Sequence, residues 1–324
     1  PLQDLYQKAL DKQNMEGLPK PIEGEFSRGD QMWLNKTVLE LMGFDFDRGS
    51  LAISNLSPMM GGHYDDTRIL VRCNKTNNFT DSLEDTLYQG ARGLYLQNLP
   101  EQWQSQPVGQ DQGMIMMNTL SALYEMIIGR TPQFFDFIAG RAEGVFRQVK
   151  NQSFEPENFY RLKKVLKRTT TRSDGDEFRK IFHDVLRYRI ERDLINGDLQ
   201  VKDLPERWNA ESKELLAMTP NNLQEGVLQN PDWFTGRFGF IPTNTLSHIM
   251  GAELQEKLFQ NIENFPQKIQ NGDFHEMHDW LKENIYSKGR LHGTFETMKG
   301  LMGEDISPQP LLDHLNRRYL SDRK

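Results

Sequence analysis

The chain has 324 residues, and its 39 Lys and Arg against 46 Asp and Glu give a formal net charge of −7. A mildly acidic chain lacks the basic surface that nucleic-acid binding needs, so we expect no nucleic-acid partner. No apolar run of roughly 18 residues occurs, so the sequence predicts no membrane-spanning helix. The single cysteine, Cys73, excludes an internal disulfide and favours an intracellular, reducing compartment such as the cytoplasm or an organelle matrix.

Apolar positions at spacings of three and four residues recur along most of the chain and predict amphipathic helices. The clearest examples cover residues 32–42, 82–96, 114–128, 178–194 and 246–262. Gly197 is expected to end the fourth of these helices, because glycine accepts the left-handed conformation of a C-cap. Arg187, Arg189 and Arg192 are expected on the solvated face of the same helix.

Strand patterns are few. Residues 51–54 are apolar, and residues 67–72 alternate polar and apolar side chains, as a half-buried strand does. The segment 58–66 between them is rich in turn-forming residues. The sequence therefore predicts a mainly α fold with a small β-sheet element. No shift in composition marks a linker, so we expect residues 1–324 to form a single domain.

Some local groups of reactive side chains have two interpretations. His275 and His278 have the spacing of a metal-binding pair on a helix, but no third ligand is evident, so a solvated surface pair is the better interpretation. Residues 63–66 have side chains of types that can bind a metal, but they lie in a predicted turn. The preference of turns for such residues explains them better. Cys73 beside Arg72 would have a lowered thiol pKa, but no His partner supports a catalytic thiol.

A series of segments resembles the Taq-type (thermostable) zinc metallocarboxypeptidases, in the same order along the chain. They are LYLQNLP at 94–100, QPVG at 106–109, SALYE at 121–125, LRY at 186–188, INGDL at 195–199, GRFGFIPT at 236–243 and the tail from residue 307. The chain is therefore similar to the C-terminal two-thirds of this family. The resemblance implies a helical, zincin-related metallocarboxypeptidase fold. It also implies an N-terminal helical lid region, which we expect to be absent here.

The resemblance implies a zinc site built on an HExxH helix, with two His ligands, a Glu general base and a third ligand, a Glu, from the next helix. In the register set by Leu94-Tyr95, the two His positions fall on Tyr88 and Arg92, and the base position falls on Gln89. The third-ligand position falls on Asn118. None of these is a usual zinc ligand, and Gln89 takes no proton near neutral pH. We therefore expect these four degenerate positions to hold no metal, and we expect no cofactor.

Two arginines are candidates for binding a peptide or another anion. The family pattern Asp-x-Arg-x-Thr corresponds to the segment that contains Asp66 and Arg68, and Arg-x-x-Ala-Asp corresponds to the segment from Arg172 to Asp176. The resemblance implicates Arg172 in holding the C-terminal carboxylate of the substrate. The alternative is that Arg68 and Arg172 each pair with an Asp such as Asp66 or Asp176 and fix the local structure.

The loss of all four motif residues favours a catalytically inactive, carboxypeptidase-like protein. In this interpretation the chain is not an enzyme but a structural or binding subunit, in a larger assembly or as a homodimer. Uncovered apolar groove walls would favour such a protein partner. Two alternatives stay open. One is an active metallocarboxypeptidase that releases C-terminal amino acids with non-standard ligands, and the other is a peptide-binding module without hydrolysis.

Overall fold

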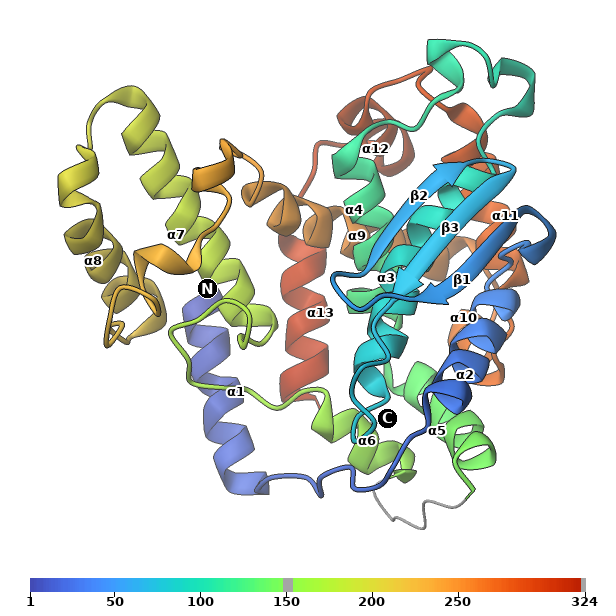
Figure 1. Ribbon diagram of the computed structural model, residues 1–324, viewed down its shortest axis with the longest axis horizontal. Helices are drawn as coiled ribbons and strands as arrows, with labels where there is room; N and C mark the ends of the chain where they lie inside the picture. The colour runs from blue at the N-terminus through green and yellow to red at the C-terminus, as the bar shows by residue number, and fades with distance from the viewer. Residues whose placement is uncertain (148–153, 322–324) are drawn as a thin grey trace. The chain divides into compact units, whose positions relative to one another are not determined.

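The computed structural model describes residues 1–147 and 154–321, and Figure 1 shows helices beside one small sheet. This confirms the predicted fold class. The described residues divide into two compact units. Unit 1 contains residues 1–18, 164–246 and 315–321, and unit 2 contains 19–147, 154–163 and 247–314. The single-domain organisation stays a prediction. None of the helices in the described ranges combines the length and the apolar character that crossing a bilayer requires.

Unit 1 is helical. Its elements are α1 (Leu2–Glu16), α7 (Glu177–Asn196), η6 (Val201–Asp203), α8 (Leu204–Leu216), η7 (Val227–Gln229), η8 (Trp233–Thr235), the start of α9 (Pro242–Asn261) and the end of α13 (Gln309–Leu320). Helices α7 and α8 lie side by side, and their core is built on the fully buried Trp208 with Leu186 and Ile190. Helix α7 ends where Gly197 adopts φ +82°, as the sequence predicts.

The buried guanidinium of Arg179 holds segments of unit 1 together that are far apart in the sequence. Its Nε donates to the hydroxyl of Tyr6 at 3.1 Å and to the carbonyl of Lys167 at 3.0 Å. Its Nη1 donates to the carbonyls of Thr169 at 3.0 Å and Leu216 at 3.2 Å. Helix α1, the segment before α7 and the end of α8 are therefore joined through one side chain.

Unit 2 contains the remaining elements. They are α2 (Arg28–Leu41), η1 (Phe46–Arg48), three strands, α3 (Thr80–Gln97), η2 (Glu101–Trp103), η3 (Pro107–Gly109), α4 (Met114–Ala122), the π-helical η4 (Leu123–Ile128), α5 (Pro132–Val145), α6 (Pro156–Leu162), most of α9, α10 (Phe265–Asn271), α11 (His275–Asn284), η9 (Tyr286–Lys288), α12 (Thr294–Met302) and the start of α13. All five helices predicted from periodicity are confirmed, and the third continues from α4 into a π-helical segment.

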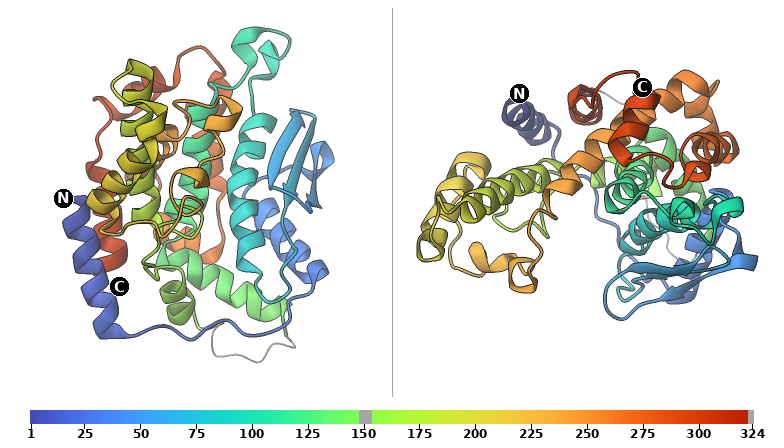
Figure 2. Two further views of the ribbon diagram at one scale, coloured as in Figure 1. Left: turned by 60° about the vertical axis from the view of Figure 1, so that its left-hand side comes forward. Right: turned by 90° about the horizontal axis from the view of Figure 1, so that it is seen from above.

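The strands form one sheet in the order β1 (Gly49–Ile53), β3 (Asp66–Val71), β2 (Met59–His63). Strand β1 is parallel to β3, with Leu51 opposite Ile69, and β2 is antiparallel to β3. Alternation along β3 buries Ile69 and Val71 against α3, which lies on this sheet in Figures 1 and 2. Both predicted strands are confirmed. Strand β2 was missed because Gly61 and Gly62 weaken its strand pattern.

Helix α3 is packed closely on two sides. A Cβ at Gly90 would lie 2.5 Å from Leu39 Cδ1 of α2, and a Cβ at Gly93 would lie 2.9 Å from Ile69 Cδ1 of the sheet and 3.0 Å from Phe44. Glycine at these positions allows a closer approach than any other residue would. The rotation of α3 about its axis is thereby fixed, and this decides which of its side chains face α4.

We predict that Gly93→Ala lowers the free energy of unfolding by about 1–3 kcal/mol, because the added methyl group overpacks the contact with Ile69. The matched control is Gly300→Ala in α12, where a Cβ would meet no atom within 4 Å. This control should stabilise the protein by about 0.5–1 kcal/mol through helix propensity. Urea unfolding of both variants measures the difference. Equal effects of the two substitutions would contradict the close packing of α3.

Candidate functional site

Four side chains of unit 2 form a hydrogen-bonded group between α3 and α4, which we call the Arg92 cluster. Tyr88 and Arg92 are four residues apart on α3, and Asn118 and Ser121 are three apart on α4, so each pair shares a helix face. The Nη2 of Arg92 donates to the Tyr88 hydroxyl at 3.0 Å and to Asn118 Oδ1. Its Nε donates to Ser121 Oγ at 3.1 Å.

Further contacts hold the Arg92 cluster in place. The Tyr88 hydroxyl lies 3.3 Å from Asn118 Oδ1, and the guanidinium carbon of Arg92 lies 4.7 Å from the centre of the Tyr88 ring. Ser121 Oγ lies 2.9 Å from the Tyr88 carbonyl and 3.0 Å from the Met117 carbonyl, so its hydroxyl donates to one of them. Asn118 and Ser121 are buried, whereas Tyr88 and Arg92 are partly exposed.

The residues at the four motif positions do not fit a zinc ion. Protein-bound zinc takes thiolate, imidazole or carboxylate ligands, and Tyr88, Gln89, Arg92 and Asn118 provide none of these. The cationic guanidinium of Arg92 contacts both Tyr88 and Asn118, so it also repels a divalent cation from this position. Gln89 is buried, and its Oε1 has no hydrogen-bond partner among the described residues. We therefore assign no chemical step to a metal at the Arg92 cluster.

Arg68, in strand β3 of unit 2, forms a fork with Asp66. Its Nε lies 3.0 Å from Asp66 Oδ1, and its Nη2 lies 2.5 Å from Oδ2. Both side chains are more than half exposed, so this pair contributes little to stability. This contact agrees with the alternative in which Arg68 pairs with Asp66 and fixes the local structure. A role of Arg68 in anion binding stays a prediction.

Arg172, in unit 1, pairs with Asp184 of α7. Its Nε donates to Asp184 Oδ1 at 2.9 Å, and Thr245 donates to Asp184 Oδ2 at 2.9 Å. Burial raises the pKa of Asp184, and the neighbouring Arg172 opposes this effect. Asp176, the partner suggested from the sequence, instead caps the N-terminus of α7 by accepting from the backbone N–H of Arg179. Peptide binding by Arg172 stays a prediction.

Arg187 is a candidate that the sequence analysis missed. It is 4% exposed, so its expected place on a solvated face is wrong, whereas Arg192 is exposed and pairs with Asp193. The guanidinium of Arg187 lies 5.9 Å from the ring of Trp208, and its Nε has no hydrogen-bond partner in the described part of the chain. Burial, followed by the charge of Arg172, lowers the pKa of Arg187 to about 10. No local pattern in the sequence marked it, because the burial of His183 on the same helix face is visible only in the structure.

The remaining candidates have ordinary structural surroundings. His275 is exposed, but His278 is partly buried with its ring 6.0 Å from that of Tyr286, so the expected surface pair is only half correct. His63 contacts Asp65 at the turn that follows β2. Cys73 is buried, and burial raises its thiol pKa, so the lowered pKa expected from its sequence neighbour is wrong.

Comparisons of the sequence and of the structure with known proteins point to the same family. The family model described as carboxypeptidase Taq (M32) metallopeptidase matches residues 1–319. Carboxypeptidase 1 of Bacillus subtilis is 26% identical over 294 residues, which cover 91% of this chain and 58% of that protein. Thermostable carboxypeptidase 1 of Pyrococcus furiosus is 26% identical over 316 residues, which cover 96% and 63%. The solved structure of Trypanosoma cruzi metallocarboxypeptidase 1 matches with a TM-score of 0.93 and 29% identity, covering 99% of this chain and 66% of that one.

These findings correct the interpretation of the chain as a catalytically inactive structural or binding subunit. The matching family and the matching structures are metallocarboxypeptidases, and nothing in the comparisons indicates a loss of activity. The interpretation rested on four motif positions, but the ligands of a metal need not come from those positions. The comparisons favour the alternative of a metallocarboxypeptidase with non-standard ligands. They confirm the resemblance to the Taq-type family and its helical fold.

We predict that Arg92→Met lowers the free energy of unfolding by about 1–3 kcal/mol, because the buried Asn118 Oδ1 loses its charged donor. Arg28→Met, at an exposed position in α2, is the control and should change stability by less than about 0.5 kcal/mol. Chemical unfolding of both variants provides the test. An Arg92 variant as stable as the control would show that the Arg92 cluster is not a stabilising network.

Burial, followed by the charge of Arg187, lowers the pKa of His183 to about 3, against a usual value near 6.5. At pH values between about 3 and 6.5, His183 is protonated in the unfolded chain but not in the folded one. Stability is therefore lost as the pH falls from about 6.5 towards 3, by up to about 1.4 kcal/mol per pH unit. In His183→Asn this slope should become shallower, as measured by urea unfolding at several pH values from 7 to 4. The exposed His275→Asn is the control, and an unchanged slope in the His183 variant would contradict the assignment.

Proposed function

Because the chain belongs to the carboxypeptidase Taq family of metallopeptidases, we propose that it binds peptides at their C-terminus and releases the C-terminal amino acid. The match to the family over residues 1–319 carries this proposal. The likeness to the Trypanosoma cruzi metallocarboxypeptidase structure supports it. The chain spans only 58–66% of the length of the relatives and the structure reported above. That this chain has the activity of those whole proteins is therefore a proposal.

The proposal requires a metal held by groups other than the four motif positions, and we assign no ligand. The residues of this chain that we propose for substrate binding recognise the C-terminal carboxylate of the peptide. A guanidinium binds a carboxylate through two parallel hydrogen bonds. Arg172 already pairs with Asp184, whereas the Nε of Arg187 has no hydrogen-bond partner in the described part of the chain, although the charges of Asp184, Asp232 and Glu191 act on it. We therefore place the substrate carboxylate at Arg187, with Arg172 as a neighbouring positive charge.

Hydrolysis of peptides with free C-termini tests the proposal. The wild-type protein, purified without chelator, is expected to release C-terminal amino acids in the presence of Zn²⁺ or Co²⁺ and to lose this activity when a chelator is added. Metal analysis of the same protein is expected to show bound metal. The informative comparison is the fourfold variant Tyr88→His, Gln89→Glu, Arg92→His, Asn118→Glu. The proposal is overturned if only this variant binds metal and hydrolyses peptide.

Peptide binding without hydrolysis is the second candidate function. The buried Arg187, with its Nε unpaired in the described part of the chain, favours it. Calorimetry with a peptide and with its C-terminal amide should give an affinity about ten-fold or more weaker for the amide, since one buried charge contact is worth more than about 1.4 kcal/mol. Arg187→Met should remove the difference, and Arg192→Met on the exposed side of α7 should preserve it. Equal affinity for acid and amide would rule out carboxylate capture.

A protein partner or a homodimer, and an intracellular reducing location, remain proposals. The single, buried Cys73 supports the location, because a chain without disulfides needs no oxidising compartment. Size-exclusion chromatography with light scattering measures the oligomeric state. A monomer without a co-purifying chain would contradict both the partner and the homodimer.

A further inference from the structure

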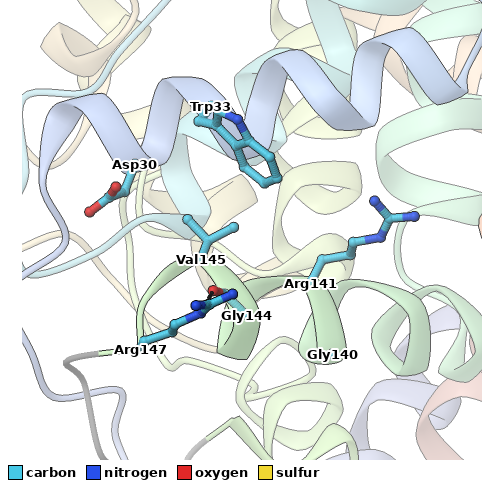
Figure 3. Close-up of a pocket in the computed structure, with 7 residues that line it drawn as sticks. All are labelled: Asp30, Trp33, Gly140, Arg141, Gly144, Val145 and Arg147. Carbon is cyan, nitrogen blue, oxygen red and sulfur yellow. Dashed lines mark hydrogen bonds between the residues drawn. The ribbon is translucent and has the colours of Figure 1, made fainter.

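A groove of about 440 Å³ lies between α2 and α5 in unit 2 (Figure 3). The exposed indole of Trp33 forms its wall on α2. Gly140, Gly144 and Val145 of α5 line the opposite side, the side chain of Arg141 lies toward one end, and that of Arg147 folds back toward Gly144. None of these residues belongs to the Arg92 cluster or to the surroundings of Arg187. The groove therefore needs an explanation of its own.

The groove is open because its floor lacks side chains. Gly140 and Gly144 are four residues apart on α5 and share one face of the helix, and a Cβ at either position would meet no atom within 4 Å. Across from them, Trp33 is 57% exposed. A large apolar ring left exposed above a bare stretch of helix backbone is typical of a binding surface.

The two arginines are held in position but are not neutralised. The guanidinium of Arg141 lies 5.4 Å from the ring of Phe137, and the Nε of Arg147 donates to the Gly144 carbonyl at 2.9 Å. Neither arginine has a carboxylate ion-pair partner among the residues that the structure describes. Asp30 lines the margin, where it hydrogen-bonds to Ser27, and Figure 3 shows its carboxylate turned away from the Trp33 ring. The groove is therefore locally cationic on a chain of net charge −7.

We propose that this groove binds an acidic peptide segment in an extended conformation, with an apolar side chain on Trp33 between two carboxylates that pair with Arg141 and Arg147. Arg141 lies within α5, and Arg147 lies two residues beyond Val145, where that helix ends. In an extended peptide, residues i, i+2 and i+4 lie on one face and span about 13 Å, and the long, flexible Glu and Arg side chains adapt to the separation of the two guanidinium groups. Trp and Arg are the residues that most often anchor such contacts.

The exposure of Trp33 favours a peptide over a small molecule. A pocket for a small ligand buries roughly 70–90% of the ligand surface. An indole that is 57% exposed forms one side of a shallow groove and does not enclose a ligand in this way. An extended chain instead gains affinity from several contacts along the groove. Guanidinium–carboxylate pairs at both ends supply the charge complementarity.

Fluorescence anisotropy with a labelled peptide tests the proposal. The probe contains Glu-Ser-Phe-Ser-Glu between Gly-Ser spacers, with a blocked N-terminus and an amidated C-terminus, so that terminal charges play no part. We expect saturable binding in the micromolar range. The double variant Arg141→Ala, Arg147→Ala and the variant Trp33→Ala should each weaken it about ten-fold or more. The double variant Gly140→Leu, Gly144→Leu should fill the groove and abolish binding without loss of fold, since these positions are open.

The control variant Lys299→Ala, Arg317→Ala removes the same charge from exposed positions elsewhere and should change the affinity by less than about two-fold. A Gln-Ser-Phe-Ser-Gln probe should bind about ten-fold or more weakly. The proposal is overturned if no binding is detected at millimolar protein. It is also overturned if the Glu and Gln probes bind equally, if the groove variants bind like the control variant, or if single-stranded RNA or anionic vesicles bind the groove in place of the peptide. Because the probe has no C-terminal carboxylate, these results are independent of the proposed peptidase function.

Discussion

The close packing of α3 is the constraint on which the arrangement of unit 2 depends. A Cβ at Gly90 would lie 2.5 Å from Leu39 of α2 and one at Gly93 2.9 Å from Ile69 of the sheet, so a larger residue at either position would require its neighbours to shift. With those two sides fixed, the face that carries Tyr88 and Arg92 is directed to α4. The hydrogen bonds of the Arg92 cluster follow from this orientation, because its donors and acceptors come from both helices.

Much of the fold could be predicted from the sequence. Helical periodicity located α2, α3, α4, α7 and α9, and the glycine after α7 marked its end, because these signals are local. Strand β2 was missed because it is stabilised by pairing with β3 and not by its own residues. The length of α3 was predicted, but its approach to α2 and the sheet is a tertiary property that no short window contains.

The candidate sites were less predictable, for a physical reason. A charged residue in a helix is expected to face water, and Arg189 does pair with Glu211 of α8 while Arg192 pairs with Asp193 of α7. Arg187 is buried because α8 brings Trp208 against the same face of α7, and this contact depends on residues far away in the sequence. The partner of Arg172 was misplaced for a similar reason, since Asp184 is brought to it by the fold of unit 1. Motif positions identify which residues to inspect, but contacts decide what those residues can do.

The Arg92 cluster also has a consequence for how these positions can change over time. Its members share donors and acceptors, so replacing one residue changes the hydrogen bonds of its neighbours, and replacing Arg92 leaves the buried Asn118 Oδ1 with only the longer contact to the Tyr88 hydroxyl. The effects of substitutions here are therefore not additive. A substitution that has little effect on stability once its neighbours have been replaced can lower stability when it is made first. The order in which these positions are substituted therefore affects the stability of each intermediate sequence.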